Sequence, residues 1–407
     1  MREDLGYGPA AHEEEDAAAQ ALLEDPAVCA VPGAGALAAR AGVARRRVVR
    51  AAGGGAGGGR VVGTASLLSA GMFFGGERVS TGALTGVAVR PEARPAGAFK
   101  ALLHGALDEL AERGAALALV QPGVQAPFRE VGFEQAGARF EVRVASRDIQ
   151  VGERDLTIRR VGPRDGATVE GLYRRHAATQ PGHLDRGPVL WDAIRRPEPG
   201  PVHAYLVEGP RELEGYVYMQ QVPRGVEAGA RPRGSSGHDL HVVDLVSLTG
   251  RAGRRLLTLF ADHQSLANEV VWHESPASTL TALLPERTFQ LTVASYWMLR
   301  IVDVVKALTQ RGYPPGVSAE LHLFVRDRDR VTNNASVILR VLDGRGSLEP
   351  GGRGTLRMSI AGLAALYSGH RSAATLRASG LLDGPDDEVA LAGTVFGGGG
   401  AWHPDLL

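Results

Sequence analysis

The spacing of apolar residues predicts alternating strands and helices in the first part of the chain. Residues 46–50 and 60–68 are rich in valine and leucine, which is typical of strands. Residues 115–120 form a short apolar run that predicts a buried strand. The helix predicted before this run has one continuous apolar face, made by Phe99, Leu102, Leu103, Ala106, Leu107 and Leu110.

A similar order of elements begins again near residue 150. Residues 155–161 are strand-like, and residues 168–177 have the spacing of a helix. A further strand over residues 239–248 and a helix over 254–263 repeat the strand and helix found within residues 84–110. The order of the elements therefore indicates a duplicated α/β unit, although few residues match.

The last part of the chain has a different pattern. Residues 297–308 place apolar side chains at helical spacing and predict a helix. Strands are then predicted over residues 319–325, 336–341 and 355–360, and helices over residues 362–367, 373–379 and 388–395. Strands followed by helices are typical of an α+β domain. We therefore expect three domains: two α/β domains over residues 1–150 and 151–290, and an α+β domain over residues 291–407.

Two glycine-rich stretches are predicted to be loops. Gly53, Gly55 and Gly58 have the GxGxxG spacing of dinucleotide-binding loops, but that fingerprint requires a helix to follow. A strand follows here, so residues 53–59 are better explained as a long hairpin loop. Residues 223–237 are rich in glycine, arginine, proline and serine and predict an exposed loop.

Composition and charge exclude several classes of protein. The 407 residues include 45 Lys and Arg and 45 Asp and Glu, and this zero net charge disfavours a broadly basic nucleic-acid binder. Cys29 is the single cysteine, which excludes an internal disulfide and a Cys-based metal cluster. The chain has no run of about 18 apolar residues and no signal-peptide profile at its start. We therefore expect a cytoplasmic protein that binds neither nucleic acid nor membranes.

One group of metal-type side chains lies on a predicted strand. His238, Asp239, His241 and Asp244 follow one another closely. Successive side chains on a strand point to opposite faces, so Asp239 and His241 share one face while His238 and Asp244 share the other. The sequence therefore predicts no metal site.

The most informative stretch joins a strand that ends at Pro91 to the helix that begins near Phe99. The free N–H groups and the positive dipole end of such a helix make an anion site suited to a pyrophosphate. Gly97 would let the backbone approach that anion closely. An ordinary βα turn would have the same appearance, so this loop alone leaves both interpretations open.

The following elements make the pattern more specific. A V-x-V-x-P strand at 87–91 is followed by R-x-x-G at 94–97, where a helix begins, and then by the strand at 115–120. Residues 127–133 read PFREVGF and contain an aromatic-x-x-x-G-F turn. This order resembles the GNAT acetyltransferases. The resemblance implies that the strand residues Val87, Ala88 and Val89 bind the pantetheine arm of acetyl-CoA. It also implies that the pyrophosphate is held by Arg94, Pro95, Ala96, Gly97, Ala98, Phe99 and Lys100.

Three later stretches resemble the Eis (enhanced intracellular survival) acetyltransferases: VLWD at 189–192, WMLRIVD at 297–303 and LAALYSG at 363–369. This resemblance implies a GNAT domain, a degenerate second GNAT domain and a C-terminal domain like sterol carrier protein type 2. It further implies acetyl-CoA as the acyl donor, an amine-bearing small molecule such as an aminoglycoside as the acceptor, and a homo-oligomer, the hexamer. Glu24 and Asp25 lie in the region that borders the amine pocket in the family, where they would attract a cation or simply be solvated.

The same resemblance implies two catalytic positions. The base of the family is the C-terminal carboxylate, which here belongs to Leu407, and the tyrosine acid corresponds to Phe128. Phe128 has no proton to give, and Pro95 has no N–H for a phosphate oxygen. A thiolate with a pKa of about 8.5 leaves without strict need of an acid, although a positioned acid contributes about 10²–10⁴-fold.

Two functions from different classes follow from these observations. One is an acetyl-CoA-dependent N-acyltransferase that acts on an amine-bearing small molecule. The alternative is a catalytically impaired GNAT-fold protein that binds or sequesters a ligand, because Phe128 replaces the tyrosine. The resemblance to sterol carrier proteins also leaves open whether the C-terminal domain carries an apolar ligand or buries that surface against its neighbours.

Overall fold

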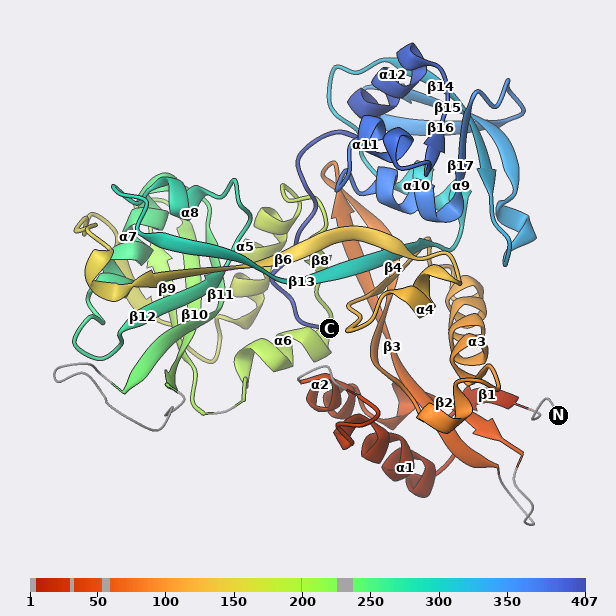
Figure 1. Ribbon diagram of the computed structural model, residues 1–407. Helices are drawn as coiled ribbons and strands as arrows, with labels where there is room; N and C mark the ends of the chain where they lie inside the picture. The colour runs from red at the N-terminus through yellow and green to blue at the C-terminus, as the bar shows by residue number, and fades with distance from the viewer. Residues whose placement is uncertain (1–4, 30–32, 53–58, 199, 225–236) are drawn as a thin grey trace.

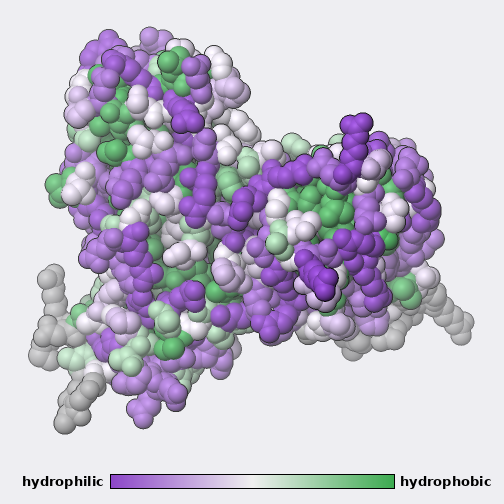
Figure 2. Space-filling model, turned by 180° about the vertical axis from the view of Figure 1, so that it is seen from behind, coloured by the Kyte–Doolittle hydropathy of each residue, from purple (hydrophilic) through white to green (hydrophobic). Residues whose placement is uncertain are grey.

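The computed structural model describes residues 5–29, 33–52, 59–198, 200–224 and 237–407, which form three lobes (Figure 1). Seen from behind, hydrophilic side chains cover most of the surface, and apolar side chains show in patches (Figure 2). None of the helices in the described ranges combines the length and the apolar character needed to cross a lipid bilayer.

The N-terminal lobe is a sheet with helices on both faces. Val48 packs with Leu22 of α1 and Ala38 of α2, whereas the next residue, Val49, packs with Leu102 of α3 on the opposite face. The antiparallel pairing of β2 with β3 confirms the predicted hairpin, whose loop at residues 53–58 lies outside the described residues. The elements of this lobe are β1 (Leu5–Pro9), α1 (Glu13–Glu24), α2 (Ala34–Ala41), β2 (Arg46–Ala51), β3 (Arg60–Phe74), β4 (Glu77–Val89), α3 (Ala98–Glu112), β5 (Leu117–Val120), α4 (Ala126–Arg129) and β6 (Glu134–Ala145).

The central lobe repeats this arrangement. Val217 packs in the cluster beneath α7, whereas its neighbours Tyr216 and Tyr218 pack in the cluster beneath α5 on the other face. The predicted loop at 223–237 joins β10 to β11, and its residues 225–236 lie outside the described ranges. The elements of this lobe are β7 (Thr157–Arg160), α5 (Gly166–Ala177), β8 (Leu184–Asp185), α6 (Pro188–Arg195), β9 (His203–Glu208), β10 (Leu213–Pro223), β11 (His238–Ser247), α7 (Gly250–Ala261), β12 (Glu269–His273) and α8 (Thr279–Ala282).

One continuous sheet joins the two lobes. Within the described residues this sheet has 13 strands, among them β5, β13 (Phe289–Ile301), β6 and β12 in that spatial order, and β6 and β13 run across the molecule from one lobe to the other (Figure 1). The helix predicted over residues 297–308 is therefore wrong in its first half. Trp297 to Ile301 belong to β13, because pairing with β5 on one side and β6 on the other buries this run completely. The helix α9 (Val304–Gln310) begins only after Asp303, whose carboxylate accepts a hydrogen bond from the Lys306 N–H at 2.9 Å.

The C-terminal lobe has a sheet of its own with the strand order β16-β15-β14-β17-β18. Leu321, Leu323 and Val325 alternate with exposed residues and bury one face of this sheet in a core shared with the helices. The remaining elements are β14 (Ala319–Arg326), β15 (Ala335–Leu342), β16 (Arg345–Pro350), β17 (Leu356–Ser359), α10 (Ile360–Tyr367), α11 (Ala373–Ala378), β18 (Leu382–Asp383) and α12 (Asp386–Phe396).

A buried ion pair fastens the C-terminal lobe to the large sheet. Arg300 of β13 is fully buried and donates to both carboxylate oxygens of Asp327 at 2.8 Å. The same guanidinium donates to the carbonyl oxygens of Val131 at 2.8 Å and Ile301 at 2.7 Å. After α12 the chain returns from this lobe to the centre of the molecule, where its C-terminus lies between the other two lobes (Figure 1).

Candidate active site

Strands β4 and β5 separate at the centre of the N-terminal lobe. They are paired in parallel from Thr81 with Leu117 to Leu84 with Val120, where β5 ends, while β4 continues to Val89. Gly86 has a φ of 59°, and a Cβ there would lie 2.9 Å from the Cβ of Ala38. Only glycine fits this bend without strain. The backbone of β4 beyond Leu84 is thereby left without β5 as a partner.

A cavity of about 720 Å³ lies where the two strands part, which is within the usual range of small-molecule sites. Most residues predicted to bind the cofactor or act in catalysis line this cavity: Val87, Ala88, Val89, Arg94, Gly97, Phe99, Lys100, Phe128 and Leu407. Three predicted residues are not in its lining. Pro95 is exposed and Ala96 half-buried in the turn before α3, and Ala98 is fully buried beneath the helix.

The start of α3 lies at this cavity and carries no negative charge. Gly97 caps the helix with a φ of 90°, no side chain caps it, and its first turn contains no acidic residue. A Cβ at Gly97 would have no atom within 4 Å, so the backbone here is open to a ligand. Arg94 donates from Nε to the Val89 carbonyl at 3.1 Å and from Nη2 to the Val28 carbonyl at 3.4 Å. The loop thus presents two cationic residues, Arg94 and Lys100, beside the positive end of a helix dipole.

Phe128, which also lines the cavity, is held in an aromatic cluster. Its ring meets Phe99 edge-on at 5.1 Å between centroids and Phe133 at 5.7 Å, and only 4% of the residue is exposed. Edge-to-face contacts at these distances stabilise the ring in one orientation. Phe128, which stands where the family resemblance implies a tyrosine, therefore has a ring of fixed orientation and no hydroxyl group.

The C-terminal residue reaches the same cavity from the far end of the chain. Leu407 is 3% exposed, and its backbone N–H donates to Oε1 of Gln121 at 2.9 Å. The Gln121 amide also donates to the hydroxyl of Ser295 on β13. Gln121 directly follows β5, so the polar residue at the end of this buried strand connects the cavity, the tail and the shared sheet.

Comparisons with known proteins agree with this architecture. Models of the acetyltransferase (GNAT) domain match residues 39–136 and 182–301, and a model of the sterol carrier protein domain matches residues 304–404. A GCN5-related N-acetyltransferase from Anabaena variabilis, solved as a crystal structure, is 30% identical with a TM-score of 0.89, covering 99% of this chain and 100% of that one. The chain belongs to the GCN5-related N-acetyltransferases.

Two other relatives extend this result. An N-acetyltransferase from Streptomyces griseus, named as uncharacterized, is 25% identical over 317 residues, which cover 73% of this chain and 74% of that one. Eis1 from Mycobacterium abscessus shares the fold, with 21% identity, a TM-score of 0.74 and 98% coverage of both chains. The predicted order of a GNAT domain, a second GNAT domain and a sterol-carrier-like domain is confirmed. Acyl transfer is the activity that this family membership supports.

The second GNAT domain of this acetyltransferase differs at the start of its corresponding helix, α7. Thr249 caps that helix by accepting from the Ala252 N–H at 3.1 Å, and its hydroxyl donates to Oε2 of Glu214 at 2.5 Å. Glu214 is 4% exposed and also accepts from Nε of Arg251 at 2.9 Å. The Thr249 hydroxyl thus takes one N–H group at the start of α7, and the Glu214 carboxylate lies beside it, so this helix start is less suited to a phosphate than the start of α3.

Several residues of the cavity were missed from the sequence. Pro26 to Cys29, Gln121 and Glu130 line it, and of the described lining residues only Glu130 has an acidic side chain. Glu24 and Asp25 are not in the lining: Glu24 accepts from Gln20, and Asp25 accepts from the Ala27 N–H. A polar residue directly after a buried strand was the available signal for Gln121.

Proposed function

We propose that this protein is an acetyl-CoA-dependent N-acyltransferase of the Eis type, which acetylates an amine-bearing small molecule. The observation that carries the proposal is one cavity that contains the edge of β4 left without β5, the start of α3 without a side-chain cap, and the C-terminal Leu407. The β4 edge supplies a surface for an extended acyl carrier, the start of α3 supplies a site for its phosphates, and Leu407 supplies a carboxylate.

The residues of the cavity fit acetyl-CoA. The β4 backbone from Thr85 to Val89 lacks β5 as a partner and faces the cavity, as a pantetheine amide chain requires. Gly97, Arg94 and Lys100 would hold the pyrophosphate at the start of α3. Bound acetyl-CoA supplies an acetyl group activated as a thioester.

The residues of this chain then have two tasks. The cavity would hold the amine beside the acyl group, and this proximity provides much of the rate enhancement. The Leu407 carboxylate would take the proton that the amine loses on attack. The C–N bond forms, the C–S bond breaks, and the thiolate leaves without a proton from Phe128.

The test is isothermal titration with acetyl-CoA, followed by acetyl-transfer assays on a panel of amines. Binding and transfer to at least one amine support the proposal, and the absence of binding at millimolar acetyl-CoA would refute it. Because the described lining is mainly apolar, the panel compares arylalkyl and alkyl amines with polycationic aminoglycosides. The resemblance to Eis further implies a homo-oligomer, which light scattering on the purified protein measures.

A second function is favoured by one specific observation, the Phe128 ring packed between Phe99 and Phe133. A protein that kept the cavity but lost its proton donor would bind acyl-CoA without turnover. Binding in the titration together with no transfer to any amine of the panel would favour this sequestering function.

A further inference from the structure

The two GNAT domains contain the same separation of parallel strands. In the central domain β11 and β12 are paired only at Leu240 with Val270 and at His241 with Val271, and β11 then continues to Ser247. A cavity lies where they part, as one does between β4 and β5. Its volume is about 80 Å³, against about 720 Å³ in the N-terminal domain. With the C-terminal tail in place, the cleft of the central domain has no space for a cofactor.

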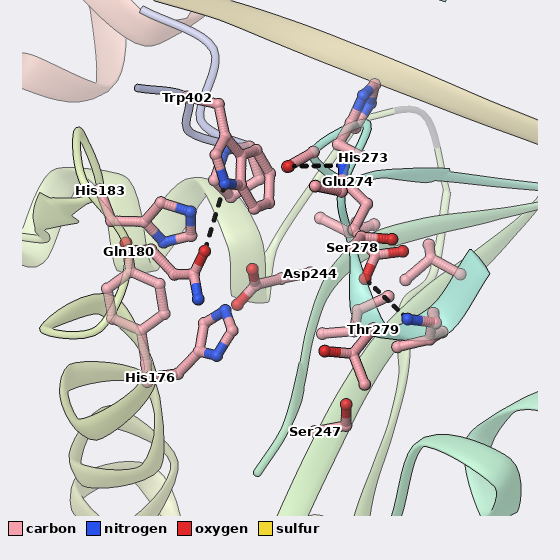
Figure 3. A pocket seen from close by; sticks show the side chains of 18 residues that line it. His176, Gln180, His183, Asp244, Ser247, His273, Glu274, Ser278, Thr279 and Trp402 are labelled. Atoms are coloured by element: carbon pink, nitrogen blue, oxygen red, sulfur yellow. Dashed lines mark hydrogen bonds between the residues drawn. The ribbon is translucent and has the colours of Figure 1, made fainter. Parts of the chain in front are cut away.

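The C-terminal tail closes this smaller cleft. Trp402 and Pro404 belong to its lining, and Figure 3 shows Trp402 beside His183, with Glu274 and Ser278 across the cavity. The rings of Trp402 and His183 meet edge-on at 4.5 Å. The same tail ends at Leu407 in the cavity of the N-terminal domain, so four residues separate Trp402 in one cleft from Leu407 in the other.

The segments beside the cleft fit closely against the backbone of the tail. The Trp402 N–H donates to the Pro181 carbonyl at 3.1 Å, and the Ala401 carbonyl accepts from the Ala138 N–H of β6 at 3.3 Å. A Cβ at Gly182 would lie 3.1 Å from the Trp402 nitrogen, so a larger residue would crowd the tail.

The residue after Trp402 is held by stacking. The His403 ring stacks on Trp297 at 5.2 Å, and burial lowers the pKa of His403 to about 3. This ring is therefore neutral at pH 7 and packs as an aromatic group rather than as a cation.

A buried arginine supplies the charged contact. Arg186 donates from Nε to Asp405 at 2.7 Å and from its two terminal nitrogens to Asp244 of β11 at 2.7 and 2.9 Å. The side chains of all three residues are at most 4% exposed. Tyr216 also donates to Asp244 at 2.6 Å, and Arg139 donates to the Pro404 carbonyl at 2.7 Å. Arg186 is thus oriented by the central domain before it meets the tail.

We infer that the central domain is a docking site for the chain's own C-terminal segment, and that Arg186 is the positioning residue that fixes where Leu407 lies. The cleft between β11 and β12 binds Trp402 and Pro404 in place of a cofactor, and Arg186 binds Asp405 beside it. The consequence for turnover rests on the proposed function, in which the Leu407 carboxylate is the base. The docking itself does not depend on that function.

The experiment cuts the folded full-length chain just before the tail. Gly398, Gly399 and Gly400 are exposed, and a Cβ at any of them has no atom within 4 Å, so a protease recognition sequence fits between Gly398 and Gly399. Native mass spectrometry after cleavage measures how long the released tail stays bound. Asp405→Ala removes the charged contact from the tail alone and leaves Arg186 paired with Asp244, and Leu406→Ala changes the adjacent, 44% exposed residue as the matched control.

We expect the wild-type and Leu406→Ala tails to remain bound, and the Asp405→Ala tail to bind about 30-fold more weakly or worse, because it loses a buried charged partner. Immediate loss of the wild-type tail, or equal retention of the Asp405→Ala and Leu406→Ala tails, would overturn the inference.

Kinetics on the uncut Asp405→Ala protein separate the docking from the proposed function. A lower kcat with unchanged KM for acetyl-CoA supports both. A tail that is released while kcat stays unchanged would leave the docking supported and would refute Leu407 as the base.

Discussion

Replacing Phe128 by tyrosine should increase turnover. The Phe128 ring is fixed by edge-on contacts with Phe99 and Phe133 and lines the cavity that Leu407 reaches. A hydroxyl added to this ring would therefore be held in one position at the cavity. A positioned acid contributes at most about 10²–10⁴-fold, which corresponds to about 2.7–5.4 kcal/mol of the activation barrier. The gain will be smaller to the extent that the departing thiolate needs no proton.

The assay is steady-state kcat with one accepted amine from pH 6 to pH 10. A tyrosine acid works only while it is protonated, so the gain of Phe128→Tyr should disappear as the pH approaches about 10. Phe99→Tyr is the matched control, because it adds the same hydroxyl to a neighbouring ring that lines the same cavity. A Phe128→Tyr protein that binds acetyl-CoA normally but is no faster than wild type at every pH would refute the reasoning.

Three further predictions concern the tail and the stability of the fold. Deleting Leu406 and Leu407 should lower kcat while the Kd for acetyl-CoA measured by titration stays nearly unchanged; full activity would exclude the tail as the base. Arg300→Met should lower the free energy of unfolding in urea by about 3–5 kcal/mol, because Asp327 stays buried without its cationic partner. Arg340→Met, in the exposed pairs with Glu320 and Glu349, should cost less than about 1 kcal/mol, and equal losses would contradict this ranking. Hydrogen bonds from Arg50 lower the pKa of Glu15 from an ordinary 4.5 to about 2, so its contribution to stability is present above pH 4.5 and is lost as the pH falls toward 2. The unfolding free energy of Glu15→Gln should depend less on pH in that window than that of wild type, and parallel curves would argue against the assignment.

The spacing of apolar residues was sufficient to predict helices and strands that bury only one face. Helix α3 was predicted from Leu102, Leu103, Ala106 and Leu107, because one apolar stripe on a helix that packs against a sheet repeats every three or four residues. The run Trp297 to Ile301 was misread because a strand buried on both faces has no alternation to distinguish it from a buried helix.

The site itself was only partly predictable. The pattern placed Arg94 and Gly97 in a loop between a strand and a helix but left open whether that loop binds an anion, and the family resemblance favoured the anion site. The positions of Phe128 and Leu407 came from the family resemblance. The cluster of Arg186, Asp244 and Asp405 was missed, because its members lie 58 and 219 residues apart and only the folded chain brings them together.

The place of β13 in the large sheet has a consequence for synthesis on the ribosome. β13 lies between β5 and β6, although it is translated after the whole central lobe. A nascent chain that has emerged only as far as Ala145 therefore has two unpaired strand edges at the middle of its first lobe, and exposed edges favour aggregation. Roughly 150 more residues must be added before β13 arrives, which takes about 8–30 s at the usual translation rates of about 5–20 residues per second. The first lobe cannot finish folding as an autonomous unit during that interval, and chaperone capture of nascent chains should peak there.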